Sequence, residues 1–171
     1  MSTSLLYHAF GIRGYHQVAT DFSEGKVIFR IAKDLNDCRC SACGSPDVAP
    51  RGQVVRQFRC LPIGHRPVLA VLPMPRVECQ KCGLIRQIGL DFADRRRSYT
   101  KGFARYALEL SRFMTIQDVA QHLGVSWDVI KEIVKQDLQR RFARPKLKRL
   151  RQLAIDEICI CLLYTSPSPR D

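Results

Sequence analysis

The feature that most limits how this chain can fold is a five-residue pattern that occurs twice, as CSACG at 40–44 and CQKCG at 79–83. A Cys-x-x-Cys turn can place two thiolates on one tetrahedral metal ion, and the glycine after it lets the backbone curl behind the sulfurs. Together the two patterns supply four thiols, which is the full ligand set of a structural zinc site. The predicted zinc ligands are therefore Cys40, Cys43, Cys79 and Cys82.

The stretch between the two patterns is long for a zinc module. It holds 35 residues, 44–78, more than the usual spacing, so this stretch must form structure of its own. The simplest arrangement is a hairpin with strands at 54–59 and 67–72 and a turn in LPIG at 61–64, which makes residues 38–94 a zinc ribbon. Four arginines are expected on these strands, where they could contact phosphate or only keep the sheet soluble: Arg56, Arg59, Arg66 and Arg76.

Two further cysteines leave alternatives open. Cys38 could compete with Cys40 as a ligand, and Cys60 could be a small buried hydrophobic residue. The glycine that follows both patterns favours Cys40 and Cys43 as the true pair. A thiol redox protein is a weaker alternative, because a redox Cys-x-x-Cys usually occurs once and opens a helix.

Charge and composition indicate the partner and the compartment. The formal net charge is +12, of which residues 1–37 contribute zero, 38–98 contribute +7 and 99–171 contribute +5. A basic excess that begins at the first cysteine pattern predicts a polyanion partner, although a solvated basic surface is the simpler alternative. Eight cysteines with no signal peptide and no membrane-spanning apolar run favour a reducing cytoplasm and no membrane partner.

The first 37 residues are expected to form a separate unit of one helix and two strands. The pattern predicts a helix over 4–10 and strands over 15–21 and 26–31, with Val27, Phe29 and Ile31 on one face. No chemistry is expected in this unit. His8 and His16 are read as packing or surface residues rather than ligands.

Residues 95–142 carry the pattern of a helix-turn-helix. Helices are predicted from Thr100 to Phe113, from a capping box at 115–118 to Leu123, and from Trp127 to Phe142. A small residue, Ala120, stands where two helices would cross, and Gly124 can take the positive φ of the tight turn. The simpler alternative is an ordinary helical hairpin, which would not need the turn glycine.

In a DNA-binding helix-turn-helix, the last of these helices would enter the major groove. The candidate DNA contacts on it are Ser126, Trp127, Asp128, Lys131 and Lys135, with Glu132 on the same outward side; both lysines are expected on phosphates, and Trp127 could instead pack on the first helix. A basic run then follows, expected to track phosphates: Arg140, Arg141, Arg144, Lys146 and Lys148.

The order of these parts resembles the ISL3 family of bacterial insertion-sequence transposases. The resemblance is carried by the paired cysteine patterns, by LPIG at 61–64, by the helix-turn-helix, and by IDEI at 155–158 after a basic linker. Cys60 stands where an Asp is expected in that family. The resemblance implies that the zinc ribbon and helix-turn-helix bind double-stranded DNA at the terminal inverted repeats of the element, in a bacterial cytoplasm beside the nucleoid.

The same resemblance implies a ribonuclease-H-like domain with an Asp-Asp-Glu triad that binds Mg²⁺ in the full-length enzyme. Asp156 matches the first Asp of that triad, and Glu157 would face the opposite side of its strand. Residues 143–161 are thus expected to be the basic linker and the first strand of a truncated catalytic domain. Residues 162–171 resemble translated sequencing-adaptor sequence and are expected to be non-native.

The overall expectation is an α+β chain of small modules that binds DNA but cannot catalyse transposition alone. The alternative is a stand-alone transcriptional regulator, which would use the same two modules to read a promoter and would not need Asp156. A homodimer is compatible with either reading.

Overall fold

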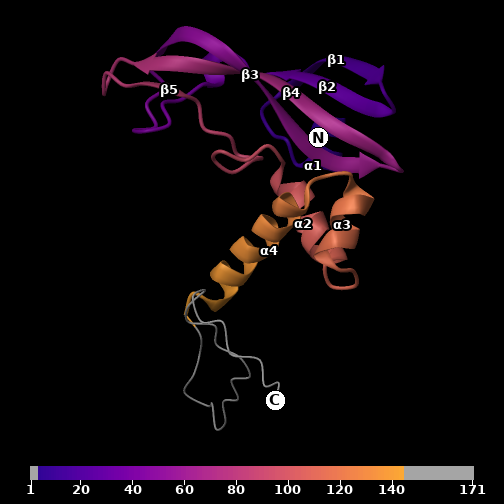
Figure 1. Cartoon of the computed structure of the whole chain (residues 1–171). Coiled ribbons are helices and arrows are strands. Elements are labelled where there is room, and N and C mark those ends of the chain that lie inside the picture. The colour runs from indigo at the N-terminus through magenta and orange to yellow at the C-terminus, as the bar shows by residue number, and fades with distance from the viewer. Residues whose placement is uncertain (1–3, 145–171) are drawn as a thin grey trace, which may run out of the picture.

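The computed structural model describes residues 4–144 and shows a mixed α+β fold, as the sequence predicts (Figure 1). A five-stranded sheet is followed along the chain by a group of three helices. The elements are α1 (Leu5–Phe10), β1 (His16–Ser23), β2 (Lys26–Ala32), a short 3-10 turn (Leu35–Asp37), β3 (Val48–Ile63), β4 (Arg66–Cys79), β5 (Ile85–Gln87), α2 (Lys101–Leu110), α3 (Ile116–Leu123) and α4 (Trp127–Phe142).

The centre of the sheet is the long antiparallel hairpin of β3 and β4. Its turn lies between Ile63 and Arg66, where Gly64 takes a φ of 59° that suits glycine. From Val68 to Met74, every second side chain of β4 is buried, which is the alternation expected of a strand with one face on a core. The buried positions then shift by one residue, to Val77 and Cys79. The predicted hairpin is therefore present, and its strands extend well beyond 54–59 and 67–72, as far as Cys79.

The N-terminal strands belong to the same sheet, which the sequence pattern does not reveal. The order is β1-β2-β4-β3, with β5 also paired to β4. β2 runs parallel to β4, in a register that places Val27 opposite Val68 and Arg30 opposite Val71. The two parts also share one hydrophobic core, in which the Phe92 ring lies 5.2 Å from the ring of Tyr15, just before β1, and 5.2 Å from the ring of Phe58 on β3. Residues 4–37 thus pack as part of one body with the hairpin.

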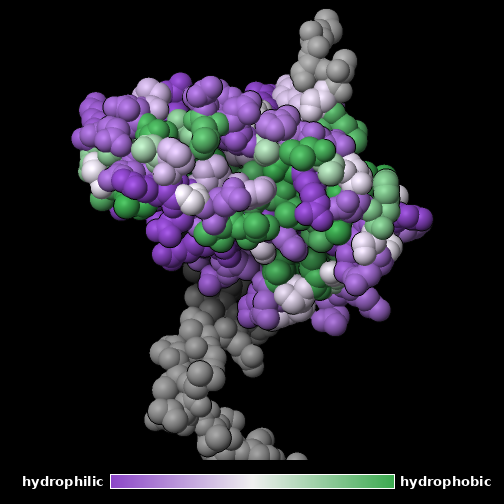
Figure 2. All heavy atoms as spheres, turned by 90° about the horizontal axis from the view of Figure 1, so that it is seen from above, coloured by the Kyte–Doolittle hydropathy of each residue, from purple (hydrophilic) through white to green (hydrophobic). Residues whose placement is uncertain are grey.

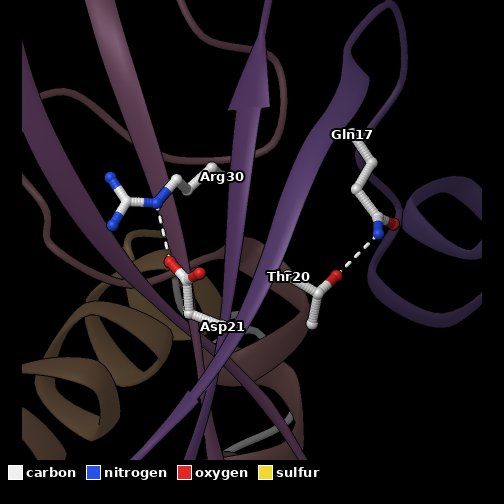
Figure 3. Close-up of polar contacts among 4 residues, drawn as sticks. All are labelled: Gln17, Thr20, Asp21 and Arg30. Atoms are coloured by element: carbon white, nitrogen blue, oxygen red, sulfur yellow. Dashed lines mark hydrogen bonds and ion pairs between the residues drawn. The ribbon is translucent and has the colours of Figure 1, made fainter.

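β1 and β2 pair as an antiparallel ribbon that carries two side-chain polar contacts (Figure 3). Nε of Arg30 lies 2.7 Å from a carboxylate oxygen of Asp21, and the amide of Gln17 donates to the Thr20 hydroxyl at 2.6 Å. Both contacts are solvent-exposed, so each adds little stability. The ribbon is held mainly by its ladder and by the buried side chains of β2.

Apolar side chains also reach the surface of the sheet. Figure 2 shows hydrophobic patches lying among hydrophilic residues on the face of the molecule seen from above. Val18 and Phe22 on β1 are 64% and 72% exposed, and Val54 and Val55 on β3 are exposed as well. Such scattered exposure is ordinary on a folded protein and assigns no function by itself.

Two prolines stand where β4 lacks a second partner. On the side of β4 away from β3, β2 pairs with residues 68–71 and β5 with 76–78, so 72–75 have no strand partner there within the described chain. The carbonyl of Pro75 accepts from the amide of Ile88 at 3.2 Å, which shows that Pro75 faces this side. Pro73, two residues earlier, faces the same way. Both prolines therefore replace N–H groups that would point into the open stretch.

The helical part has its own core and the predicted helix starts. The Thr100 hydroxyl accepts from the amide of Phe103 at 3.1 Å, and the Thr115 hydroxyl accepts from the amide of Asp118 at 3.2 Å. Each hydroxyl satisfies an amide that the first turn of a helix leaves without a partner. The buried side chains of this core are Tyr99, Phe103, Ala107, Val119, Ala120, Leu123, Ile130 and Ile133.

Two arginines fasten the helices to the sheet. The carbonyl of Arg59 on β3 accepts from the amide of Thr100 at 2.9 Å, and Nη2 of Arg59 donates to the carbonyl oxygen of Leu123 at 2.5 Å. Arg97 pairs with Glu132 of α4 at 2.8 Å. Arg56 and Arg59 are half-buried, so the expectation that they lie on the strand surface is wrong: their guanidinium groups are used inside the protein.

Candidate functional site

The structure brings the four predicted zinc ligands together at the end of the hairpin where β3 begins and β4 ends. The sulfurs of Cys40, Cys43, Cys79 and Cys82 all lie within 4.8 Å of one another. Cys40 and Cys82 sulfurs are 3.7 Å apart, and Cys43 and Cys79 sulfurs are 3.5 Å apart. A disulfide would need about 2.05 Å. Four sulfurs at about 2.3 Å from a tetrahedral zinc ion would be separated by about 3.8 Å, so the cluster fits such an ion.

The two cysteine turns are built alike. In each, the glycine amide donates to the carbonyl of the first cysteine at 2.9 Å: Gly44 to Cys40 and Gly83 to Cys79. Gly44 and Gly83 have φ values of 75° and 68°, where a side chain would cause strain. The repeated geometry explains why the glycine recurs in both patterns. The backbone presents all four sulfurs to one point without help from other side chains.

Local backbone amides favour the thiolate form of two of these cysteines. Amides of Cys43 and Ala42 direct their N–H groups at Cys40, and they lower the pKa of its thiol to about 6. The amide of Cys82 likewise lowers the pKa of Cys79. Since a metal binds the thiolate, the donors that the backbone supplies suit metal coordination.

The other two described cysteines lie away from the cluster. Cys38 is fully buried in the sheet core, where its thiol contacts the carbonyl of Asp34 at 3.5 Å, so it does not compete with Cys40. Cys60 is also fully buried, on β3, and burial raises the pKa of its thiol to about 12. Both are small buried core residues, which the sequence offered as an alternative for Cys60. Cys159 and Cys161 lie outside the described residues.

The turn between α3 and α4 has the geometry of a helix-turn-helix. Ala120 is buried at the helix crossing, and its carbonyl accepts from the amide of Val125 at 3.0 Å. Gly124 has a φ of 60° and ends α3 in the left-handed conformation. This cap turns the chain so that α4 can start three residues later, at Trp127.

We predict that Gly124→Ala lowers the free energy of unfolding by about 1 kcal/mol, because an L side chain is strained at this φ. The cost comes from the backbone alone, since the nearest atom to the added methyl would be Arg59 Nη2 at 3.9 Å, an ordinary contact. Urea denaturation measures the change. Gly89→Ala is the matched control, because Gly89 has no positive φ and open space around it; equal losses at the two positions would contradict the explanation.

α4 presents an outward face with the candidate DNA contacts. Trp127 is 42% exposed, and Nζ of Lys131 lies 4.5 Å from the centre of its ring. Ser126 is the N-cap residue, and Asp128 and Lys135 are exposed. The side chains of Lys131 and Lys135 make no ion pair within the described chain.

Other candidates on α4 form ion pairs with residues of the same chain. Glu132 accepts from Arg97 and from Gln136, which leaves it less available to a partner. Arg140 and Arg141 both pair with Asp137, at 2.7 and 2.6 Å. Arg144 is exposed at the end of the described residues. Lys146, Lys148 and Asp156 lie outside the described residues, as do the linker and the terminal segment 162–171.

The sequence reasoning missed the structural arginines and a groove beside β5. Arg59 and Arg97 join sheet and helices through contacts between residues far apart in the chain, for which no local pattern exists. The groove, lined by arginines from β3, β4, β5 and the loop before α2, brings together residues 41–96. The arginine triplet at 95–97 was the one local signal of it.

Comparison with known proteins shows which domain the helical part is similar to. Residues 90–137 match the helix-turn-helix domain of transposase family ISL3. The match covers the C-terminal part of the loop before α2, then α2, α3 and most of α4. It confirms both the predicted helix-turn-helix and the resemblance to this transposase family.

A curated relative extends the similarity beyond the helices. The transposase for insertion sequence element IS1001 of Bordetella parapertussis is 27% identical over 121 residues, which are 71% of this chain and 30% of the relative. The aligned part of this chain thus corresponds to less than a third of that transposase. No solved structure gives a significant match. Within the described residues, no helix is both long and apolar enough to cross a bilayer.

Proposed function

We propose that this chain is the DNA-binding part of a transposase that recognises the terminal inverted repeats of an insertion sequence in the bacterial cytoplasm. The observation that carries the proposal is the exposed face of α4, which begins directly after the tight turn of an ISL3-type helix-turn-helix. In this class of domain, the second helix of the motif lies in the major groove. Ser126, Trp127 and Asp128 are the proposed base-proximal contacts, and Lys131 and Lys135 the proposed phosphate contacts.

The four-cysteine cluster is the proposed site of one structural zinc ion, held by Cys40, Cys43, Cys79 and Cys82. The sulfur distances and the backbone donors support zinc, and a zinc ion with four thiolates has no open position for catalysis. Its proposed role is to close the open end of the β3–β4 hairpin. Mg²⁺ would be used only in a full-length enzyme, with Asp156 as one ligand.

Replacing both α4 lysines tests the proposed DNA contacts. Lys131→Gln together with Lys135→Gln is expected to weaken duplex binding at least tenfold at low salt and to reduce the slope of log K against log salt by about 2, because two phosphate contacts are lost. Fluorescence anisotropy with a labelled duplex of about 30 base pairs, three helical turns, measures both quantities. The duplex carries the terminal repeat of the surrounding element.

The control removes the same charge elsewhere. Lys26→Gln with Lys33→Gln removes two charges at the two ends of β2, in the sheet and not on α4, and should change affinity little. Unchanged binding by the α4 variant would refute the assignment of its lysines. A wild-type protein that binds a promoter fragment but not the terminal repeat would refute the transposase role in favour of a transcriptional regulator.

A further inference from the structure

A groove of about 870 Å³ lies between the sheet and the loop that leads to α2, and Ser41 of the first cysteine turn is part of its lining. Its floor includes apolar side chains such as Met74, Ile88 and Ala93. Its charged lining consists of five arginines and one acid: Arg56, Arg76, Arg86, Arg95, Arg96 and Asp94. Such a concentration of one charge in a concave surface creates a strong positive potential.

The arginines of this groove are not neutralised within the described chain. Arg76, Arg86, Arg95 and Arg96 are exposed, and none of them takes part in an ion pair with a described residue. The one acid, Asp94, lies 3.8 Å from Lys101. Four unpaired guanidinium groups repel one another, so an anionic ligand would stabilise them.

The backbone holds these arginines in place. β5 pairs with β4 so that Arg86 stands opposite Val77 and Gln87 opposite Arg76. Arg96 adopts a φ of 65°, in a turn closed by the bond from the Arg97 amide to the Asp94 carbonyl at 3.1 Å. A non-glycine residue in this conformation costs energy that the surrounding structure must offset. The turn directs the 95–96 arginines to the groove.

Arg56 is fixed differently from the other four. Its guanidinium lies 4.8 Å from the ring centre of Phe58 and donates to the carbonyl of Arg97 at 2.7 Å. It therefore ties the loop to β3 and forms a rigid, charged inner wall. A preformed wall lowers the entropy cost of binding a ligand.

The groove adjoins the outward face of α4. Arg97, the residue after the groove arginines, pairs with Glu132 of α4 at 2.8 Å. Asp128 and Lys135 lie four residues before and three residues after Glu132, and so flank it on the same side of the helix. This side of α4 therefore lies next to the loop that carries the groove residues Arg95 and Arg96.

We propose that this groove binds the sugar–phosphate backbone of the same DNA duplex whose major groove receives α4. The inference rests on the proposed DNA-binding function and adds a second contact surface to it. Arginines at several separate backbone positions suit a series of phosphates along a strand, and phosphate contacts carry no sequence information. The apolar floor is suited to contact with deoxyribose. The groove would fix the direction in which the duplex leaves the recognition helix.

The test uses Arg86→Gln with Arg95→Gln in the zinc-loaded full chain. The probe is a labelled duplex of scrambled sequence, about 30 base pairs long, because phosphate contacts do not depend on sequence. Affinity in about 0.1 M salt is expected to fall roughly tenfold to sixtyfold, and the salt slope to decrease by about 2. Zinc content and the unfolding midpoint should stay unchanged, since both side chains are exposed.

The matched control is Arg66→Gln with Arg105→Gln, which removes the same charge from the far end of the hairpin and from the α1-facing side of α2. Equal losses of DNA affinity in the two double variants would overturn the proposal that the groove binds DNA, because they would indicate only a general effect of net charge. Wild-type affinity of the groove variant for the duplex would also overturn the proposal that the groove binds DNA. If the α4 lysine variant lost affinity in the same assay, the proposed function would still stand. A wild-type chain that binds no duplex at low salt would refute both proposals.

Discussion

Cys79→Ser is expected to release the zinc ion and to lower the free energy of unfolding by several kcal/mol. Cys79 is buried at the last position of β4, and its partner sulfur on Cys43 lies 3.5 Å away on the other cysteine turn. The four sulfurs of the turns at 40–44 and 79–83 face one another, so one ion would link the two turns. Zinc-finger peptides gain about 10–16 kcal/mol from zinc. Because this chain also has a hydrophobic core of its own, we expect a smaller loss, on the order of 5 kcal/mol.

Zinc stoichiometry by elemental analysis and urea denaturation with and without a chelator measure this effect. The matched control is Cys60→Ala, since Cys60 is equally buried but lies outside the cluster. It should keep one zinc ion per chain and lose about 1 kcal/mol for the lost sulfur contacts. A Cys79→Ser protein with one tightly bound zinc ion and wild-type stability would show that the cluster is not the metal site.

Arg59→Ala is expected to detach the helices from the sheet and to cost about 2–4 kcal/mol. The Arg59 guanidinium donates to the carbonyl of Leu123, the last residue of α3, where the helix dipole favours a cation. Removing it leaves that carbonyl without this donor and opens space beneath Gly124. Burial lowers the pKa of Arg59, yet the group stays charged at neutral pH.

Differential scanning calorimetry checks this expectation, because loss of coupling should separate one unfolding transition into two. Arg59→Met keeps the aliphatic stem and should show a smaller loss, which separates packing from the hydrogen bond. Arg66→Ala, at an exposed position on β4, should change stability by less than about 0.5 kcal/mol. A single transition at the wild-type temperature in Arg59→Ala would mean that other contacts join the two parts.

The parts of this protein that could be predicted are those written in short stretches of sequence. Each cysteine turn is encoded within five residues, and the structure gives both turns the same hydrogen bonds. The helix starts at Thr100 and Thr115 follow from a hydroxyl placed before an apolar period, and both caps are present. Gly124 predicted the turn for a local reason too, its freedom to adopt a positive φ.

The parts that could not be predicted depend on residues distant in the chain. The parallel pairing of β2 with β4 joins residues about forty positions apart in the chain. The alternating apolar residues of β2 fit a separate hairpin of β1 and β2 equally well. Arg59 looked like any charged residue on a strand, yet it is half-buried between two cores. The groove arginines come from four segments that only the folded sheet brings together. Such contacts leave no periodic signal in one sequence.

Pro73 and Pro75 have a consequence for how this protein behaves at high concentration. A bare strand border offers amide hydrogens to any extended peptide, and that is a common start of aggregation. The amide nitrogens of Pro73 and Pro75 carry no hydrogen, so at these two positions β4 offers an incoming chain no donor. The sheet can thus leave one short border uncovered, next to an arginine-rich concavity, without attracting foreign β-structure.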